Sequence, residues 1–311
     1  MIPAYNCSVF LPYAIESVLA QDPGSETMQI EVVDDYSSDA DVEALVKRIG
    51  KGRVTYFRQE KNVGSLRNFE TCINRAKGKY IHLLHGDDRV KPGYYKHIQA
   101  LFTTYPEAGA AFCAWNNIDD ENSIFRRSDI EVGKPGLLED WLQKLAEHTR
   151  IQYVAMTVKR EAYEKLGAFY GVTYGEDWEM WARVAKNYPT AYTPEILAEY
   201  REHTSSISSH SFLSGKNIQD TSKVINTISS YLPKKEQKKN IQIAHKNYIC
   251  WVFDYINEVW LRTGNWHLVL NQVKEILKVY VNLGILIMVF KLALKVCISL
   301  SYRNLKKLFN Y

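Results

Sequence analysis

The stretch Tyr80-Ile81-His82-Leu83-Leu84-His85-Gly86-Asp87-Asp88 places a polar cluster directly after a short, mostly apolar run. A run of this length that ends in a turn is typical of a buried strand. Two further clusters follow strand-like segments: Pro3–Asn6, and Asp34–Asp39 after the β-branched run Ile30–Val33. In open parallel α/β sheets, ligands bind beyond the carboxyl ends of the strands. We therefore expect the three clusters to converge on one edge of a sheet.

Amphipathic helices alternate with these strands, which indicates an α/β fold with a mostly parallel sheet flanked by helices. The first strand is expected to be short, because only Met1 and Ile2 precede the first cluster. Asp39 is a candidate cap for the second helix. The other expected elements are strands at Val54–Phe57 and Ala110–Ala114, and helical faces made by Leu11, Ala14, Ile15, Val18 and Leu19, by Val42, Leu45, Val46 and Ile49, and by Phe69, Cys72, Ile73 and Ala76.

Composition narrows the class of protein. With 46% hydrophobic and 24% charged residues, the 311-residue chain is expected to be folded rather than disordered. Its length suits a catalytic domain at 1–210 and a smaller helical segment at 211–311. The five cysteines are scattered without a C-x-x-C pair, and no signal peptide precedes the first motif, so we expect reduced thiols in the cytosol. No G-x-G-x-x-G follows any strand, which argues against a dinucleotide-dependent dehydrogenase.

The charge is unevenly distributed. Residues 211–311 hold 15 Lys and Arg against 5 Asp and Glu, a net +10, whereas residues 1–210 hold 24 against 30, a net −6. A basic tail indicates an anionic partner, and the lack of a nucleic-acid motif favours lipid. At roughly 100° per residue, the basic and apolar side chains of 274–308 fall on opposite sides, which predicts a helix lying in the membrane interface at the cytoplasmic face of the membrane. The alternative is a helix packed on its own domain.

Three groups of side chains could carry chemistry. Asp87 and Asp88 are adjacent carboxylates that are costly to hold together without a cation such as Mg or Mn, although a Gly-Asp-Asp turn that caps a helix would look the same. Asp177 follows Glu176 and lies beside tryptophan, so it could be a general base or a helix cap. His203 is a candidate ligand or a structural histidine. Asp34 and Asp35 could bind a nucleobase or ribose, or could begin a turn.

Taken in order, the motifs resemble those of family 2 glycosyltransferases with the GT-A fold. They are Pro3-Ala4-Tyr5-Asn6, Val33-Asp34-Asp35-x-Ser37-x-Asp39, Asn62-x-Gly64 with Arg67-Asn68, Gly86-Asp87-Asp88, Glu176-Asp177 and Tyr200-Arg201-x-His203. The resemblance covers roughly residues 1–208. It implies inverting transfer of a sugar from a nucleotide-sugar donor, with UDP favoured, onto a glycan or lipid-linked acceptor. The Gln-x-x-Arg-Trp signature of processive synthases is missing, which favours addition of single sugars.

The resemblance also implies roles for individual residues. Pro3, Ala4 and Tyr5 match the loop along the nucleoside. Asp34 matches the acid that reads the base, with Asp35 beside it, and Arg67 matches a position near the donor phosphates. Asp87 matches the last Asp of the Asp-x-Asp motif at the metal and donor, with Asp88 as a second metal ligand. Glu176 belongs to the donor site, Asp177 matches the catalytic base, and His203 matches the histidine that joins the metal shell.

The chain departs from the family pattern at one position, because His85 stands where the first Asp of Asp-x-Asp is expected. This leaves open a catalytically degenerate protein that only binds nucleotide or glycan. A sugar-nucleotidyltransferase is a further alternative, but Met1–Gln21 lacks the glycine-rich loop that would hold a triphosphate. The expected cofactor is a divalent cation, Mn or Mg. Nucleic acid is not expected as a partner.

Overall fold

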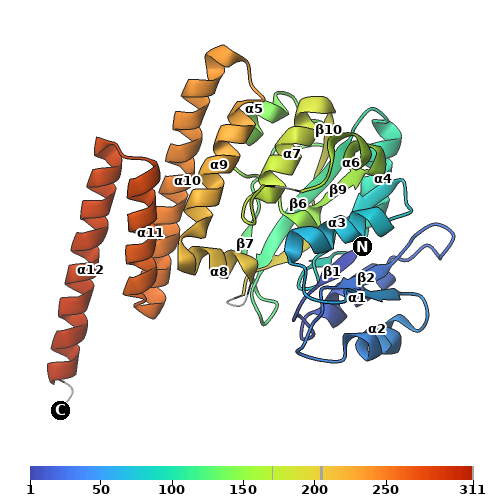
Figure 1. The fold of residues 1–311 in the computed structure, drawn as a ribbon, viewed down its shortest axis with the longest axis horizontal. Helices are drawn as coiled ribbons and strands as arrows, with labels where there is room; N and C mark the ends of the chain where they lie inside the picture. The colour runs from blue at the N-terminus through green and yellow to red at the C-terminus, as the bar shows by residue number, and fades with distance from the viewer. Residues whose placement is uncertain (170, 204–205, 310–311) are drawn as a thin grey trace. The chain divides into compact units, whose positions relative to one another are not determined.

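The computed structural model describes residues 1–169, 171–203 and 206–309, with side chains described as far as residue 296 (Figure 1). The chain forms two compact units. The first comprises Met1–Leu145 and Thr149–His203, and the second comprises Ala146–His148 and the described residues from 206 onward. The first unit ends at His203, and the domain boundary at residue 210 stays a prediction.

The first unit begins with a parallel three-stranded sheet. Its strands are β1 (Ile2–Ala4), β2 (Glu31–Asp34) and β3 (Thr55–Arg58), in the order β1-β2-β3. Helices α1 (Leu11–Leu19) and α2 (Val42–Gly50) connect these strands, and α3 (Ser65–Arg75) follows them. The first strand has three residues, as its short sequence predicts. Strand–helix–strand connections of this kind direct the carboxyl ends of all three strands to the same edge.

The segment after β4 (Tyr80–His82) runs beside β1. The amide of Leu84 donates to the carbonyl of Met1 at 3.0 Å, and the amide of Gly86 donates to the carbonyl of Pro3 at 3.1 Å. These bonds continue the parallel arrangement beyond β4. They place the cluster His85–Asp88 beside the loop that follows β1.

The remaining strands form a mixed sheet with the order β4-β9-β6-β10-β5. The long strands β6 (Ala110–Ile118) and β10 (Thr190–Arg201) pair in parallel, whereas β9 (Met156–Lys159) is antiparallel to β4 and β6. Short antiparallel strands complete the sheet: β5 (Arg89–Val90) and β8 (Gly136–Leu137) on β10, and β7 (Ile124–Arg127) on β6. The other elements of this part of the chain are α4 (Tyr94–Thr104), α5 (Trp141–Glu147), the 3₁₀ turn η1 (Tyr153–Ala155), α6 (Arg160–Leu166) and α7 (Glu176–Asn187).

The cap of α2 differs from the prediction. Asp41, not Asp39, accepts a hydrogen bond from the amide of Ala44 at 2.9 Å. Asp39 instead accepts a hydrogen bond from the amide of Ser8 in the loop after β1, at 2.8 Å. Both aspartates have the chemistry of a cap. A tertiary contact between two loops, which local sequence does not reveal, decides between them.

The second unit is helical, as predicted for the tail. Its helices are α8 (Ile207–Ser214), α9 (Lys216–Ser229), α10 (Lys234–Thr263), α11 (Trp266–Val279) and α12 (Leu283–Phe309). A buried amide pair fixes α9 against α11, because Asn217 and Gln272 donate to each other's side-chain oxygens at 3.1 and 2.8 Å. Within the described part of the chain, no helix is both long and apolar enough to span a bilayer.

The prediction of one continuous helix over 274–308 is wrong, because the structure divides this segment between α11 and α12. Asn282 causes the division: its side-chain oxygen accepts a hydrogen bond from the amide of Ile285 at 2.9 Å and so begins a new helix. Four residues of the predicted helix, Arg303, Lys306, Lys307 and Leu308, lie outside the residues whose side chains are described.

Candidate active site

Direct hydrogen bonds join the loops that follow β1 and β2. The amide of Asn6 donates to the Ser37 hydroxyl at 2.9 Å, and the amide of Ser38 donates to the Asn6 side chain at 2.8 Å. The loop after β4 is bonded to Pro3 of β1 through the amide of Gly86. The three polar clusters therefore meet at one edge of the sheet, as the sequence predicts.

Glycine at position 86 is required by this close approach. A Cβ atom built there would lie 2.6 Å from the sulfur of Cys7 and 3.4 Å from the carbonyl oxygen of Pro3. The first of these distances is shorter than real Cβ contacts allow. A side chain at this position would push the carboxylate loop away from β1, so Gly86 sets the position of the residues on either side of it.

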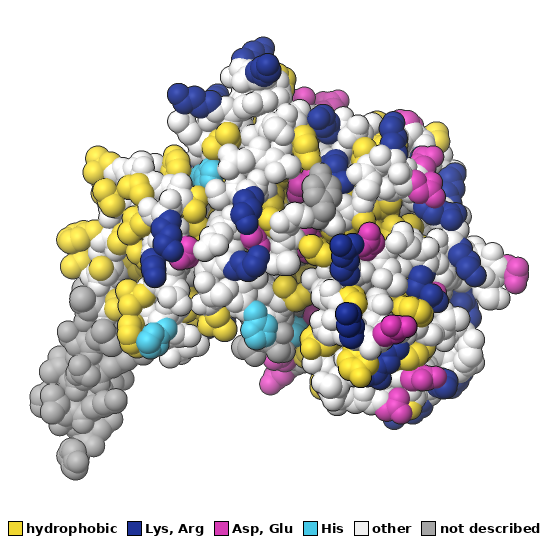
Figure 2. Space-filling model, in the orientation of Figure 1, with side chains coloured by type: hydrophobic (Ala, Val, Ile, Leu, Met, Phe, Trp, Pro, Cys, Tyr) yellow, Lys and Arg dark blue, Asp and Glu magenta, His cyan; other side chains and the backbone are white. Residues whose placement is uncertain are grey.

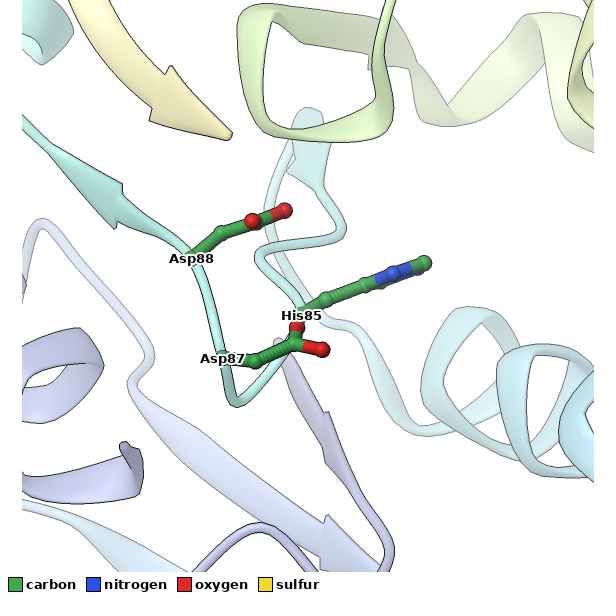
Figure 3. Close-up of side chains that lie close together, drawn as sticks. All are labelled: His85, Asp87 and Asp88. Atoms are coloured by element: carbon green, nitrogen blue, oxygen red, sulfur yellow. The ribbon is translucent and has the colours of Figure 1, made fainter. Parts of the chain in front are cut away.

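Three potential ligands leave this loop on the same side: the side chains of His85, Asp87 and Asp88 (Figure 3). Each offers one ligand atom, and these atoms lie within 4.8 Å of one another. Oδ1 of Asp88 accepts a hydrogen bond from the amide of Arg201 at 2.8 Å. Oδ2 of Asp88 and Nε2 of His85 are buried without a hydrogen-bond partner in the described structure. Because buried polar atoms normally have partners, this donor set fits a bound divalent cation.

The two adjacent carboxylates are electrostatically different. Burial opposes ionisation of Asp87, but its hydrogen bond with His203, 3.0 Å long, and the nearby His85 outweigh burial and lower the pKa of Asp87. Burial and then the charge of Asp87 raise the pKa of Asp88 well above its ordinary value. Two carboxylates in one buried site repel each other in this way unless a cation balances them.

Arg201 holds the carboxylate loop in place. Its side chain donates to the carbonyls of Asp87 at 2.8 Å and Asp119 at 2.6 Å, and to the side chain of Asn122 at 2.8 Å. Its backbone amide is the donor to Asp88. Arg201 belongs to one of the sequence motifs, but no role is predicted for it from the sequence. Its position two residues before His203 is the signal that could have indicated one.

Tyr153, in η1, connects the carboxylate loop with the Glu176-Asp177 motif. Its ring packs against the imidazole of His85 with centroids 4.4 Å apart, and its hydroxyl donates to the buried carboxylate of Glu176 at 3.1 Å. Phe69 stacks on the same imidazole at 4.8 Å. Tyr153 is not among the residues predicted from the sequence, and no local motif around it indicates this contact.

Asp177 lies in the first turn of α7, where its carboxylate accepts a hydrogen bond from the amide of Trp178 at 2.7 Å. The neighbouring side chain of Trp178 is buried, as is that of Trp181. Burial raises the pKa of Asp177 to about 6. A carboxylate with such a pKa is ionised at neutral pH and is a stronger base than an ordinary aspartate, which suits a general base.

The residues predicted to bind the donor occupy varied environments. Asp34 is fully buried and accepts hydrogen bonds from the Tyr56 hydroxyl at 2.7 Å and the Ser37 amide at 3.0 Å. The carboxylate of Asp35 accepts hydrogen bonds from the amides of Val63 and Gly64 at 2.7 and 3.0 Å, so it orders the loop before α3.

The other residues predicted to bind the donor lie nearer the surface or in the sheet. Ala4 is buried in β1, and Tyr5 is half exposed directly after it. Arg67 is exposed on α3 and pairs with Glu70 at 2.7 Å. Pro3 contributes its carbonyl to the contact with Gly86. The contacts of all these residues with a donor remain predictions.

Comparison with known proteins adds independent information. The sequence model described as Glycosyl transferase family 2 matches residues 1–167. An uncharacterized protein of Mycobacterium tuberculosis (strain CDC 1551 / Oshkosh) is 26% identical over 236 residues, which cover 72% of this chain and 73% of that protein. The succinoglycan biosynthesis protein ExoO of Rhizobium meliloti is 31% identical over 158 residues, 48% of this chain and 43% of that one.

Among solved structures, residues 1–349 of S. aureus TarS superpose with a TM-score of 0.63 at 12% identity, covering 89% of this chain and 79% of that one. The same TarS fragment in complex with UDP-GlcNAc superposes with a TM-score of 0.62 at 14% identity, over 79% and 69% of the two chains. At such low identity these likenesses establish a shared fold.

Proposed function

Because the chain belongs to glycosyl transferase family 2, we propose that it transfers a sugar from a UDP-sugar to a glycan or lipid-linked acceptor with inversion at the anomeric carbon. The observation that carries this proposal is that the first unit holds both a candidate general base and a cluster of candidate cation ligands. Asp177 has the pKa of a general base, and Tyr153 connects its motif to a cluster of cation ligands.

In this reaction Asp177 accepts the proton of the acceptor hydroxyl while the hydroxyl oxygen attacks the anomeric carbon. The bond between that carbon and the diphosphate breaks, and the bonding electrons leave with the nucleoside diphosphate. Attack from the face opposite the leaving group inverts the anomeric centre. General-base assistance is typically worth about 10²–10⁴-fold in rate.

The diphosphate leaves with additional negative charge, which the loop at 85–88 is suited to balance. Asp87 and Asp88, with His203 bonded to Asp87, would hold Mn or Mg. Such an ion supplies positive charge next to the leaving group. Arg201 keeps the loop in position through its bonds to the backbone of Asp87 and Asp88.

Two of the compared proteins support the choice of substrates. TarS shares the fold and has been crystallised with UDP-GlcNAc, which favours a UDP-sugar donor. ExoO takes part in succinoglycan biosynthesis, which favours a saccharide acceptor in polysaccharide assembly. The chain matches less than half of ExoO, so the acceptor is proposed only as a class.

The test is release of nucleoside diphosphate from UDP-, GDP- and dTDP-sugars, with candidate acceptors, in the presence of Mn, Mg or EDTA. We expect metal-dependent release from a UDP-sugar, strongly reduced in Asp177→Asn. Asp41→Asn, at the exposed start of α2, is the matched control. If calorimetry shows that the donor binds but no acceptor yields turnover, the protein is a nucleotide-binding relative instead. Release of pyrophosphate would indicate a nucleotidyltransferase.

We also propose that the second unit contacts an anionic lipid surface at the cytoplasmic face of the membrane. On α12, Leu283, Leu286, Ile287, Phe290 and Leu294 are exposed. Figure 2 shows hydrophobic side chains gathered there. Lys291 and Lys295 are exposed on the same helix. An exposed apolar face beside lysines is the pattern of a helix that lies in a lipid interface.

Sedimentation with lipid vesicles tests this second proposal. We expect the full chain to bind vesicles that contain phosphatidylglycerol and to leave them when Phe290 and Leu294 are both changed to Glu. Ile130→Glu, an exposed apolar position in the first unit, is the control. If the double variant binds as well as the parent, the apolar face of α12 is not the membrane contact.

A further inference from the structure

We propose that His85 is itself a ligand of the cation, and that its imidazole nitrogen makes this centre prefer Mn²⁺ to Mg²⁺. The inference deepens the proposed transfer reaction and rests on it for the presence of a catalytic cation. It assigns a function to the one residue by which this chain departs from the Asp-x-Asp pattern.

The first argument is the position of the imidazole. His85, Asp87 and Asp88 present their ligand atoms within 4.8 Å of one another, on the same side of the loop (Figure 3). Nε2 of His85 and Oδ2 of Asp88 are the two buried atoms of this cluster without a hydrogen-bond partner among the described residues. Asp88 is only 1% exposed. Buried polar atoms of this kind normally have a partner, and a cation held by the three side chains would supply one.

The second argument is that the ring is held in place. Phe69 packs on it with centroids 4.8 Å apart, and Tyr153 packs on it at 4.4 Å. Tyr153 is itself tied to Glu176 through its hydroxyl. Aromatic neighbours restrict rotation of the imidazole without using its nitrogens. A ligand whose orientation is fixed before the ion arrives loses little conformational entropy on binding.

His203 has a different relation to the site. Its Nε2 lies 3.0 Å from Oδ2 of Asp87, so its imidazole is engaged by a carboxylate of the cluster. A histidine bonded to a ligating carboxylate orients that ligand, in the way that groups outside the coordination sphere commonly do. We therefore assign His203 as the positioning residue for Asp87, and His85 as the nitrogen ligand.

The third argument concerns metal preference. Magnesium favours oxygen ligands and gives up its water reluctantly, whereas imidazole nitrogen suits the first-row transition ions. Replacement of a carboxylate by a neutral imidazole also removes one negative charge from the site. The loss of charge weakens the binding of both ions, whereas the nitrogen ligand disfavours Mg²⁺ relative to Mn²⁺. An aspartate at position 85 should restore an all-oxygen site.

Pulsed electron paramagnetic resonance on Mn²⁺ tests the assignment without turnover. The full chain is mixed with Mn²⁺ alone and, in a second sample, with Mn²⁺ and UDP. We expect ¹⁴N modulation from a directly bound imidazole in the parent protein. His85→Asp should lose it, and His203→Asn should keep it. Titration of the Mn²⁺ signal with Mg²⁺ should require about tenfold less Mg²⁺ for displacement from His85→Asp than from the parent.

Several results would overturn the inference. Modulation that survives in His85→Asp but disappears in His203→Asn would make His203 the ligand. Absence of nitrogen modulation in both parent samples would show that no imidazole is bound to the ion. Absence of bound Mn²⁺ in both parent samples would show that the cluster does not hold this ion. The His203→Asn arm keeps the test decisive if His85→Asp fails to fold. Loss of sugar transfer with the spectroscopic pattern intact would count against the proposed reaction and not against this site.

Discussion

Asp177→Asn should make the protein more stable and, at the same time, nearly inactive. The partly buried carboxyl group has a pKa of about 6, against an ordinary value of 3.8. A pKa raised by folding means that the protonated group favours the folded state, and this advantage is lost as the pH rises from 3.8 to about 6. Asparagine is neutral at every pH and can still accept the hydrogen bond from the Trp178 amide. The variant should therefore escape the cost of ionisation.

The size of the effect follows from the same two values. The step from 3.8 to about 6, at about 1.36 kcal/mol for each pH unit, corresponds to about 3 kcal/mol. Because Asp177 keeps some exposure to solvent, screening reduces the expected gain to about 2 kcal/mol. The free energy of unfolding of Asp177→Asn should approach that of the parent below about pH 3.8 and exceed it by about this amount at pH 7 and above.

Urea unfolding, followed by tryptophan fluorescence at several values between about pH 5 and pH 8, measures this difference. Turnover of the parent should fall on the acid side with a midpoint near pH 6, because only ionised Asp177 can accept a proton. A stability difference that does not widen with pH would show that burial does not perturb this carboxylate. A variant with turnover within tenfold of the parent would remove Asp177 from the mechanism.

Three further substitutions test the contacts around the site. Gly86→Ala should cost about 1–3 kcal/mol of unfolding free energy and weaken Mn²⁺ binding, because its Cβ would meet the sulfur of Cys7. Adding Cys7→Ala should recover part of the stability and part of the Mn²⁺ affinity. If neither recovers, the strain does not come from the contact with Cys7. Tyr153→Phe should cost about 1–3 kcal/mol of unfolding free energy by removing one hydrogen bond to buried Glu176. The retained ring should leave Mn²⁺ affinity close to that of the parent, and a large loss of affinity would contradict this separation. Arg201→Lys should lower both thermal stability and Mn²⁺ affinity, because lysine lacks the planar guanidinium that reaches three acceptors. Unchanged affinity would show that the carboxylate loop keeps its conformation without these bonds.

The sequence predicts those parts of the fold that depend on local periodicity. Alternating apolar runs and amphipathic stripes indicate the β1–α3 region, and polar residues after strands predict that the first, second and fourth strands bring their loops together. The bonds between Asn6 and Ser37 and between Gly86 and Pro3 confirm that convergence. These predictions succeed because the geometry of parallel strands fixes where a residue that follows a strand must lie.

Contacts between distant segments could not be predicted in this way. Tyr153 touches His85 and Glu176 across long separations in the chain, and nothing in its own neighbourhood of sequence indicates that role. Asp39 and Asp41 are equally good caps by residue type, and a contact with Ser8 decides between them. The break between α11 and α12 depends on capping by Asn282, which competes with a helical pattern that continues on both sides.

Burial links the two halves of the proposed chemistry. The same exclusion of water that raises the pKa of Asp177 also raises that of Asp88, beside an Asp87 whose pKa is lowered. At Asp177 the raised pKa gives a base of suitable strength. At the 85–88 loop His203 stabilises ionised Asp87, whereas burial and the charge of Asp87 oppose ionisation of Asp88, which a bound cation would favour. An imidazole in place of a third carboxylate lowers that repulsion, and this gives a physical reason for His85 at a position where the family pattern has an acid.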